Sequence, residues 1–123
     1  MLDTCAIFGT LTRDLLLGAA EAGLFRPMWS DEILTELVTH LAGKQGLSEQ
    51  QLQHLTGCMN EAFPDAVVNA PADLIASISV QLKDPDDAHV IASALVGKAD
   101  AVVTRNLEHF SGDLMENLGL EAI

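Results

Sequence analysis

The sequence predicts an α/β fold: a three-layer α/β/α sandwich with a central, mainly parallel sheet. Helix-like and strand-like segments alternate along the chain, and this alternation favours a parallel sheet covered by helices. Residues 100–104 (DAVVT) are rich in β-branched side chains, as is typical of a strand in the buried middle of such a sheet. The 123 residues, 49% of them apolar, are expected to form one domain, residues 1–123, with its own hydrophobic core.

The first quarter of the chain predicts two short strands around a helix. Residues 1–8 are mostly apolar and predict the end of a strand. Residues 24–29 (LFRPMW) predict a second short strand. Between them we expect a helix over 12–22, stopped by Gly23, with one apolar face made by Leu15, Leu16 and Ala19.

Two longer helices follow, and each has a clear start signal. Ser30 suits the N-cap of a helix whose buried stripe is Ile33, Leu34, Leu37, Val38 and Leu41. Ser48 with Gln51 makes a capping-box pattern for a second helix. The apolar face of this second helix is expected to consist of Leu52, Leu55, Met59 and Phe63.

The remainder of the chain continues the alternation of strands and helices. The expected elements are a strand at 65–70, helices at 71–82 and 84–96, the strand at 100–104, a loop with a short helix at 107–119 and a last strand at 120–123.

The charge balance limits the function classes. There are 18 acidic residues against 6 Lys and Arg, a net charge of −12. This balance opposes nucleic-acid binding that relies on a basic surface. It is compatible with binding divalent cations or a basic partner.

No apolar run is long enough to span a membrane, so no membrane association is expected. The first ten residues lack the basic and apolar regions of a signal peptide. Cys5 and Cys58 have no metal-like spacing, and we expect them to be buried thiols of a cytoplasmic protein.

Three acids at residues 84–87 (DPDD) allow two interpretations. Asp84 suits an N-cap before Pro85, and Asp86 and Asp87 then fall in the first helical turn, where the helix dipole favours negative charge. Asp87, however, shares the apolar stripe of the following helix, where a carboxylate is costly unless it is paired or bound to a cation. Helix capping and metal binding both remain open.

In parallel sheets the functional site lies at the carboxyl ends of the strands. Asp3 follows the first strand, Asn106 follows the strand at 100–104, and Asp87 begins the helix that leads into that strand. These distant residues are therefore expected to converge at one end of the sheet.

Four segments together resemble PIN-domain nucleases, in particular the VapC-type toxin-like branch: LDTCAIF, WSDEILTEL, DPDDAHVIASAL and ADAVVTRNLEHF. Their order and spacing match over nearly the whole chain. The resemblance implies a PIN-like fold and hydrolysis of RNA with Mg²⁺ or Mn²⁺, whose hard-ligand preference suits carboxylates. It also implies an antitoxin partner and a homodimer.

The resemblance also implies the site. Asp3, Glu36 and Asp87 match the family's catalytic and metal-binding acids, and Asn106 stands where the family usually has Asp. The positions expected to support the site are Thr4, Thr104, Asp84 and Asp86. A solvated Glu36 is the alternative for that position, because on a helical wheel it lies just outside the buried stripe.

Arg13 and Arg105 are candidate phosphate contacts, although each also suits a plain surface charge. His89 and His109 are possible general bases, but a surface or hydrogen-bonded histidine is the simpler interpretation. Two further functions stay open. One is a catalytically weak PIN-like protein-interaction module, favoured by Asn106 and the acidic surface. The other is a phosphoacceptor domain, which would need two acids near the first strand end, where this chain has only Asp3.

Overall fold

The centre of the fold is a set of five short extended segments joined by backbone hydrogen bonds. In the computed structural model, which describes residues 1–110 and 112–123, only β1 (Ala101–Val102) and β2 (Glu121–Ala122) are regular strands, and they pair in parallel. Parallel bridges also join Leu2 to Val103 and Trp29 to Val67. The Leu2 amide donates to the Met28 carbonyl and so links these two pairs.

The resulting order of segments across the sheet is 66–68, 28–29, 1–3, 101–103, 121–123. In chain order this is third, second, first, fourth, fifth. The order reverses between the first and fourth segments, and such a reversal is where parallel α/β sheets form a crevice for ligands. The predicted α/β class with a parallel sheet is confirmed.

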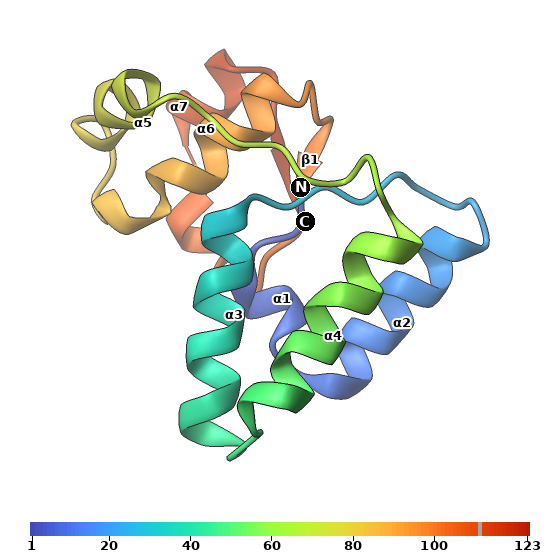
Figure 1. Ribbon diagram of the computed structural model, residues 1–123. Helices are drawn as coiled ribbons and strands as arrows, with labels where there is room; N and C mark the ends of the chain where they lie inside the picture. Colours follow the sequence, from blue (N-terminus) through green and yellow to red (C-terminus); the bar gives the residue numbers. More distant parts are fainter. Residues whose placement is uncertain (111) are drawn as a thin grey trace.

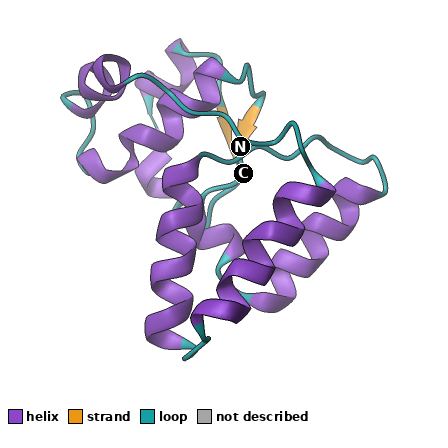
Figure 2. Ribbon diagram, viewed as in Figure 1, coloured by secondary structure: helices purple, strands orange, loops and turns teal. Residues whose placement is uncertain are grey.

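Helices make up most of the rest of the chain (Figures 1 and 2). They are α1 (Thr4–Ile7), α2 (Thr10–Glu21), α3 (Asp31–Lys44), α4 (Glu49–Ala62), α5 (Ala72–Ser79), α6 (Ala88–Val96) and α7 (Asp113–Asn117), with 3₁₀ turns η1 (Pro85–Asp87) and η2 (Leu107–Phe110). In Figure 1, α5, α6 and α7 gather at one end of the molecule and α3 with α4 at the other. In the described part of the chain, none of the helices combines the length and apolar character needed to cross a bilayer.

Buried apolar side chains from both ends of the molecule form one core. Its largest fully buried members are Trp29, Phe110, Leu2, Ile7, Ile33, Leu37, Leu41, Ile91, Val90 and Val102. Helix α6 is buried on almost every side, from Ala88 to Ala94. Such a helix fixes the positions of the residues at its start, because it has little freedom to move against its neighbours.

The predicted helix starts are confirmed where the signal is local. The Ser30 hydroxyl accepts from the Ile33 amide, and Ser48 with Gln51 forms the complete capping box. The Asp84 carboxylate accepts from the Asp86 amide and Pro85 opens η1. These caps depend only on residues within one turn of each other, so they are readable from sequence.

The prediction that residues 1–8 are a strand end is wrong beyond Asp3. Residues 4–7 form α1, because the Asp3 side chain accepts from the Thr4 amide and starts a helical turn. The extended segment is therefore only three residues long.

The predicted inner face of α2 is wrong at Leu15, which is 72% exposed, whereas Leu16 packs against the core as predicted. The stripe that faces inward is Arg13, Leu16, Leu17 and Ala20, which recur at helical spacing. Arg13 can be buried because its guanidinium donates to the carbonyls of Ile7 and Phe8 at the end of α1. The sequence pattern did not predict this face, because Arg13 is charged and was not counted among the buried residues.

Two further expectations about burial are wrong. Leu24 was expected in a strand, but its amide donates to the Ala19 carbonyl and closes the end of α2, which leaves the side chain exposed. Cys58 was expected to be buried, but it lies on the outer side of α4, whose inner side carries Leu52 and Met59.

Truncation of a leucine should distinguish the core from the α2 surface. Leu37→Ala should lower the free energy of unfolding by roughly 2–5 kcal/mol, because Leu37 is fully buried. Leu15→Ala is the matched control and should change it by about 0.5 kcal/mol or less. Chemical denaturation followed by circular dichroism measures both. Equal losses in the two variants would contradict this packing.

Candidate functional site

Asp3 lies where the sheet order reverses, and its carboxylate joins the two central segments. Oδ2 accepts from the Thr104 hydroxyl at 2.9 Å, and Oδ1 accepts from the Thr4 amide at 2.8 Å. The Asp3 amide donates to the Val103 carbonyl. Asp3 is only 7% exposed. A carboxylate buried in this way is held in one orientation by its donors.

Asp87 ends the η1 turn and directly precedes α6, whose other end leads toward β1. A helix that returns before a strand places its start at the carboxyl end of that strand, which is also the Asp3 end. The Asp87 side chain is 17% exposed. Burial raises the pKa of this carboxyl, the charges of Asp84 and Asp3 raise it further, and His109 offsets part of the effect.

His109 lies in η2, which follows β1, and its Nδ1 is 3.1 Å from Oδ2 of Asp87. Asp84, Asp87 and His109 each offer a ligand atom, and all three atoms lie within 4.8 Å of one another. Among the described residues, this is the group of His, Cys, Asp and Glu side chains that meets a metal-like spacing.

Glu36 lies in the second turn of α3 and contacts α6 through a histidine. Oε1 of Glu36 is 2.7 Å from Nε2 of His89, and Oε2 of Glu32 is 3.7 Å from the Nδ1 of the same ring. Burial lowers the pKa of His89, but Glu36, Glu32 and Asp3 raise it by more, so the net shift is upward. The prediction for His89 was a surface or hydrogen-bonded histidine, and the structure buries it against Glu36.

The structure leaves several buried polar atoms at this place without a hydrogen bond. In the described part of the chain they are Thr4 Oγ1, Glu36 Oε1, Asp87 Oδ2 and His89 Nδ1. Histidine nitrogens nevertheless lie within hydrogen-bonding distance of the two carboxylate oxygens, 2.7 Å for Glu36 and 3.1 Å for Asp87. A buried polar atom without a partner costs about 1–3 kcal/mol, so the two histidines offset much of the cost of burying these carboxylates. Oxygen atoms of this kind fit a hard divalent cation.

Sequence comparison now adds to this geometry. A family model described as the PIN domain matches residues 1–108, which is most of the chain. The chain belongs to the PIN domain family. Proteins with this domain are generally nucleases that use divalent metal ions and act on RNA. Neither a curated protein nor a solved structure matches the chain.

The other predicted residues of the PIN domain lie around these acids in different ways. Thr104 is buried, and its hydroxyl also accepts from the Asn106 amide. The side chain of Asn106 is exposed. Asp86 is exposed at η1, beside Asp87.

The two predicted phosphate contacts differ in the structure. Arg105 is exposed, and its guanidinium donates to the Thr12 hydroxyl at 2.8 Å. Arg13 is 6% exposed and donates to carbonyls at the end of α1. This arrangement favours a structural role for Arg13 over contact with a phosphate.

Cys5 is a site neighbour that sequence reasoning missed. Its Sγ lies 3.1 Å from Oδ2 of Asp3 and 3.2 Å from Oγ1 of Thr104, and it accepts from the Arg105 amide. Burial raises the pKa of the Cys5 thiol above its ordinary value. A signal was present in the sequence, because Cys5 follows Asp3 by two residues, but only the α1 turn directs both side chains to Thr104.

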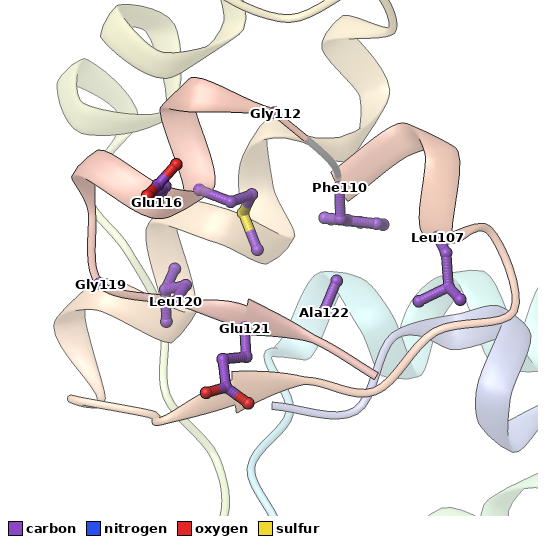
Figure 3. A pocket seen from close by; sticks show the side chains of 9 residues that line it. Leu107, Phe110, Gly112, Glu116, Gly119, Leu120, Glu121 and Ala122 are labelled. Atoms are coloured by element: carbon purple, nitrogen blue, oxygen red, sulfur yellow. The ribbon is translucent and has the colours of Figure 1, made fainter.

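The chain also has an apolar hollow beside α7 and β2, with a volume of about 560 Å³ (Figure 3). Phe110, Leu107 and Ala122 face it, and Glu116 and Glu121 lie at its edge. None of Asp3, Glu36 and Asp87 lines it. The hollow is therefore separate from the carboxylates.

Replacing Thr104 should test whether its hydroxyl supports Asp3. Thr104→Val removes the donor to a buried carboxylate and should cost roughly 1.5–3 kcal/mol of unfolding free energy. Thr104→Ser keeps the hydroxyl and should cost only the lost methyl group, about 1 kcal/mol. Denaturant titration measures both. If Thr104→Val lost less free energy of unfolding than Thr104→Ser, the hydrogen bond between Thr104 and Asp3 would not stabilise the fold.

Proposed function

We propose that this chain is a Mg²⁺- or Mn²⁺-dependent endoribonuclease whose catalytic carboxylates are those of Asp3, Glu36 and Asp87. One observation carries the proposal: the largely buried Asp87 carboxylate belongs to a group of side chains with metal-like spacing, and the charge of Asp3 acts on it. Membership of a nuclease family supports the same reaction. The alternative of helix capping explains Asp84, but not the buried oxygen of Asp87.

Each residue has a definite task in this proposal. Asp3 is held by Thr104 and by the Thr4 amide, so its carboxylate needs little reorganisation to receive a cation. A bound divalent ion would lower the pKa of a water molecule and stabilise the charge that develops on a phosphodiester. Asn106 supplies a neutral oxygen at most.

The residues around the carboxylates have supporting tasks. Asp84 fixes the η1 turn through its bond to the Asp86 amide, and Asp86 adds negative charge beside Asp87. Arg105, on the exposed side, is the proposed phosphate contact. With a net charge of −12, few phosphates can be neutralised, so RNA binding should depend only weakly on salt.

We further propose the biological setting: a VapC-like toxin of a toxin–antitoxin pair, acting in the cytoplasm as a homodimer. The resemblance of the four sequence segments supports this setting. A second function, a PIN-like module that acts by binding a protein partner, is favoured by one observation. Asn106 is neutral and exposed, so it adds no charge to the site.

Cleavage of single-stranded RNA is the direct test. The protein should cut RNA with Mg²⁺ or Mn²⁺ and stop when a chelator is added. Asp87→Asn should reduce the rate by about a hundredfold or more, since loss of even an outer partner of a metal costs 10–100-fold. Asp65→Asn removes an exposed acid elsewhere and should leave the rate unchanged. Asn106→Asp should raise metal affinity and the rate.

Melting temperatures of the same variants separate metal binding from cleavage. An ion at ten times its dissociation constant stabilises the fold by about 1.4 kcal/mol, which corresponds to a rise of several degrees. Wild type and Asp65→Asn should show this rise and Asp87→Asn should lose most of it. Equal trace cleavage by wild type and Asp87→Asn would indicate contamination and favour the protein-binding function.

The homodimer can be tested by light scattering. Leu11 and Leu15 are 82% and 72% exposed on α2, so an apolar contact between copies is available there. We expect twice the mass of one chain at high micromolar concentration, and one chain mass for Leu15→Glu. A wild-type monomer at that concentration would contradict the dimer.

A further inference from the structure

The outer side of β2 is free to pair with another strand. The order of segments across the sheet ends with β2, which pairs with β1 on one side. On that side the Glu121 amide donates to the Asp100 carbonyl, and the Ile123 amide donates to the Val102 carbonyl. In a parallel ladder, alternate residues of a strand make the bonds to one neighbour, so the amide and carbonyl of Ala122 point away from β1. In the described part of the chain, neither group has a hydrogen-bond partner.

The apolar hollow lies directly beside this edge, and the Ala122 side chain faces it (Figure 3). Its most buried members are Phe110, Met115 and Leu120, and Leu107, which is 52% exposed, stands at its rim. A strand added beside β2 would direct every second side chain to the same face of the sheet as Ala122. With a volume of about 560 Å³, the hollow has room for a large apolar side chain from such a strand.

The charges around the edge and the hollow all have one sign. Residues 107–123 contain four acids and neither Lys nor Arg. The four acids are Glu108, Asp113, Glu116 and Glu121, and each is exposed. A surface of one sign attracts segments of the opposite charge and repels segments of its own. The chemistry of this edge therefore selects a basic occupant.

The same charges argue against a second copy of this chain as the occupant. Pairing two copies along β2 would place the four acids of one copy beside those of the other. Charged side chains on an edge strand are a common means by which proteins prevent such pairing. An edge that repels its own copies, but keeps an open amide, an open carbonyl and an apolar hollow, fits a strand from a different protein.

We propose that the β2 edge and its hollow bind an extended, basic segment of a partner protein. The segment adds a strand beside β2, and one of its apolar side chains fills the hollow. Backbone hydrogen bonds with Ala122 provide affinity, while the hollow and the acids select the sequence of the segment. This surface lies apart from the carboxylates of the proposed nuclease, since none of Asp3, Glu36 and Asp87 lines the hollow. The inference therefore goes beyond that function and does not rest on it.

Synthetic peptides test the binding mode without altering the protein. The probe is a short, capped, fluorescent peptide in which Lys alternates with Leu or Val, and fluorescence anisotropy measures its binding to the full chain. The peptide should bind, and a matched peptide with Glu in place of each Lys should not. Methylating two backbone nitrogens of the basic peptide keeps its charge and removes two ladder donors, so it should weaken binding by about tenfold or more. Equal binding of the basic and acidic peptides, or of the methylated and unmethylated peptides, would overturn the proposal.

Hydrogen exchange followed by nuclear magnetic resonance locates the bound peptide. The Ala122 amide should exchange quickly in the free protein and be protected when the basic peptide is added, because it then donates to the new strand. The Glu121 and Ile123 amides already donate to carbonyls of the sheet and should be protected in both states. An Ala122 amide that stays unprotected at saturating peptide would overturn the proposal.

Charge reversal tests the selection of a basic segment. The double variant Glu116→Lys with Glu121→Lys should weaken binding of the basic peptide by about tenfold at low salt and gain binding of the acidic peptide. Glu61→Lys is the matched control, because Glu61 is an exposed acid on α4, and it should leave both affinities unchanged. Circular dichroism checks that each variant is folded. Equal effects of the double variant and of Glu61→Lys would show that the acids beside β2 do not select the peptide, and would overturn the inference.

Discussion

The hydrogen bonds to the Asp3 carboxylate hold the centre of the molecule together. One oxygen starts α1 through the Thr4 amide, and the other accepts from Thr104 on the neighbouring segment. Burying a carboxylate is costly unless donors compensate for the lost water, and here the donors come from both sides of the sheet reversal. The hydrogen bonds that join the two central segments therefore also fix where the Asp3 carboxylate lies and allow its charge to be buried.

The remaining acids are arranged under a different constraint, which is burial together with mutual repulsion. The packing of α6 buries Asp87 near Asp84 and Asp3; burial raises the pKa of its carboxyl most, and the two neighbouring charges raise it further. His89 partly compensates Glu36, and His109 partly compensates Asp87. A chain with a net charge of −12 concentrates more negative charge here than its own cations relieve, which is the condition under which a metal ion stabilises a fold.

The sequence predicted those features that depend on short-range chemistry. The N-caps at Ser30 and Ser48 and the strand near residue 102 follow from neighbouring residues, so they were readable. The burial of Arg13 was not, because its stripe contains a charge that only the end of α1 satisfies.

In the candidate site, too, some features follow from nearby residues and others depend on how distant elements pack. The strand ends and the resemblance pointed to Asp3, Glu36 and Asp87, and those assignments stay predictions. The contact between His89 and Glu36 depends on how α6 packs beside α3, and no local pattern records such packing. The approach of His109 to Asp87 depends likewise on the return of the chain after β1.

The sheet order has a consequence for synthesis of the chain. The first segment lies at the centre and pairs with a segment about a hundred residues later, so the Asp3–Thr104 bond spans 101 positions. Contacts between residues so far apart in the sequence form slowly, because the long loop between them must close first. On the ribosome, the Asp3 carboxylate cannot receive its Thr104 donor until residue 104 has emerged, so this end of the sheet is completed late in synthesis.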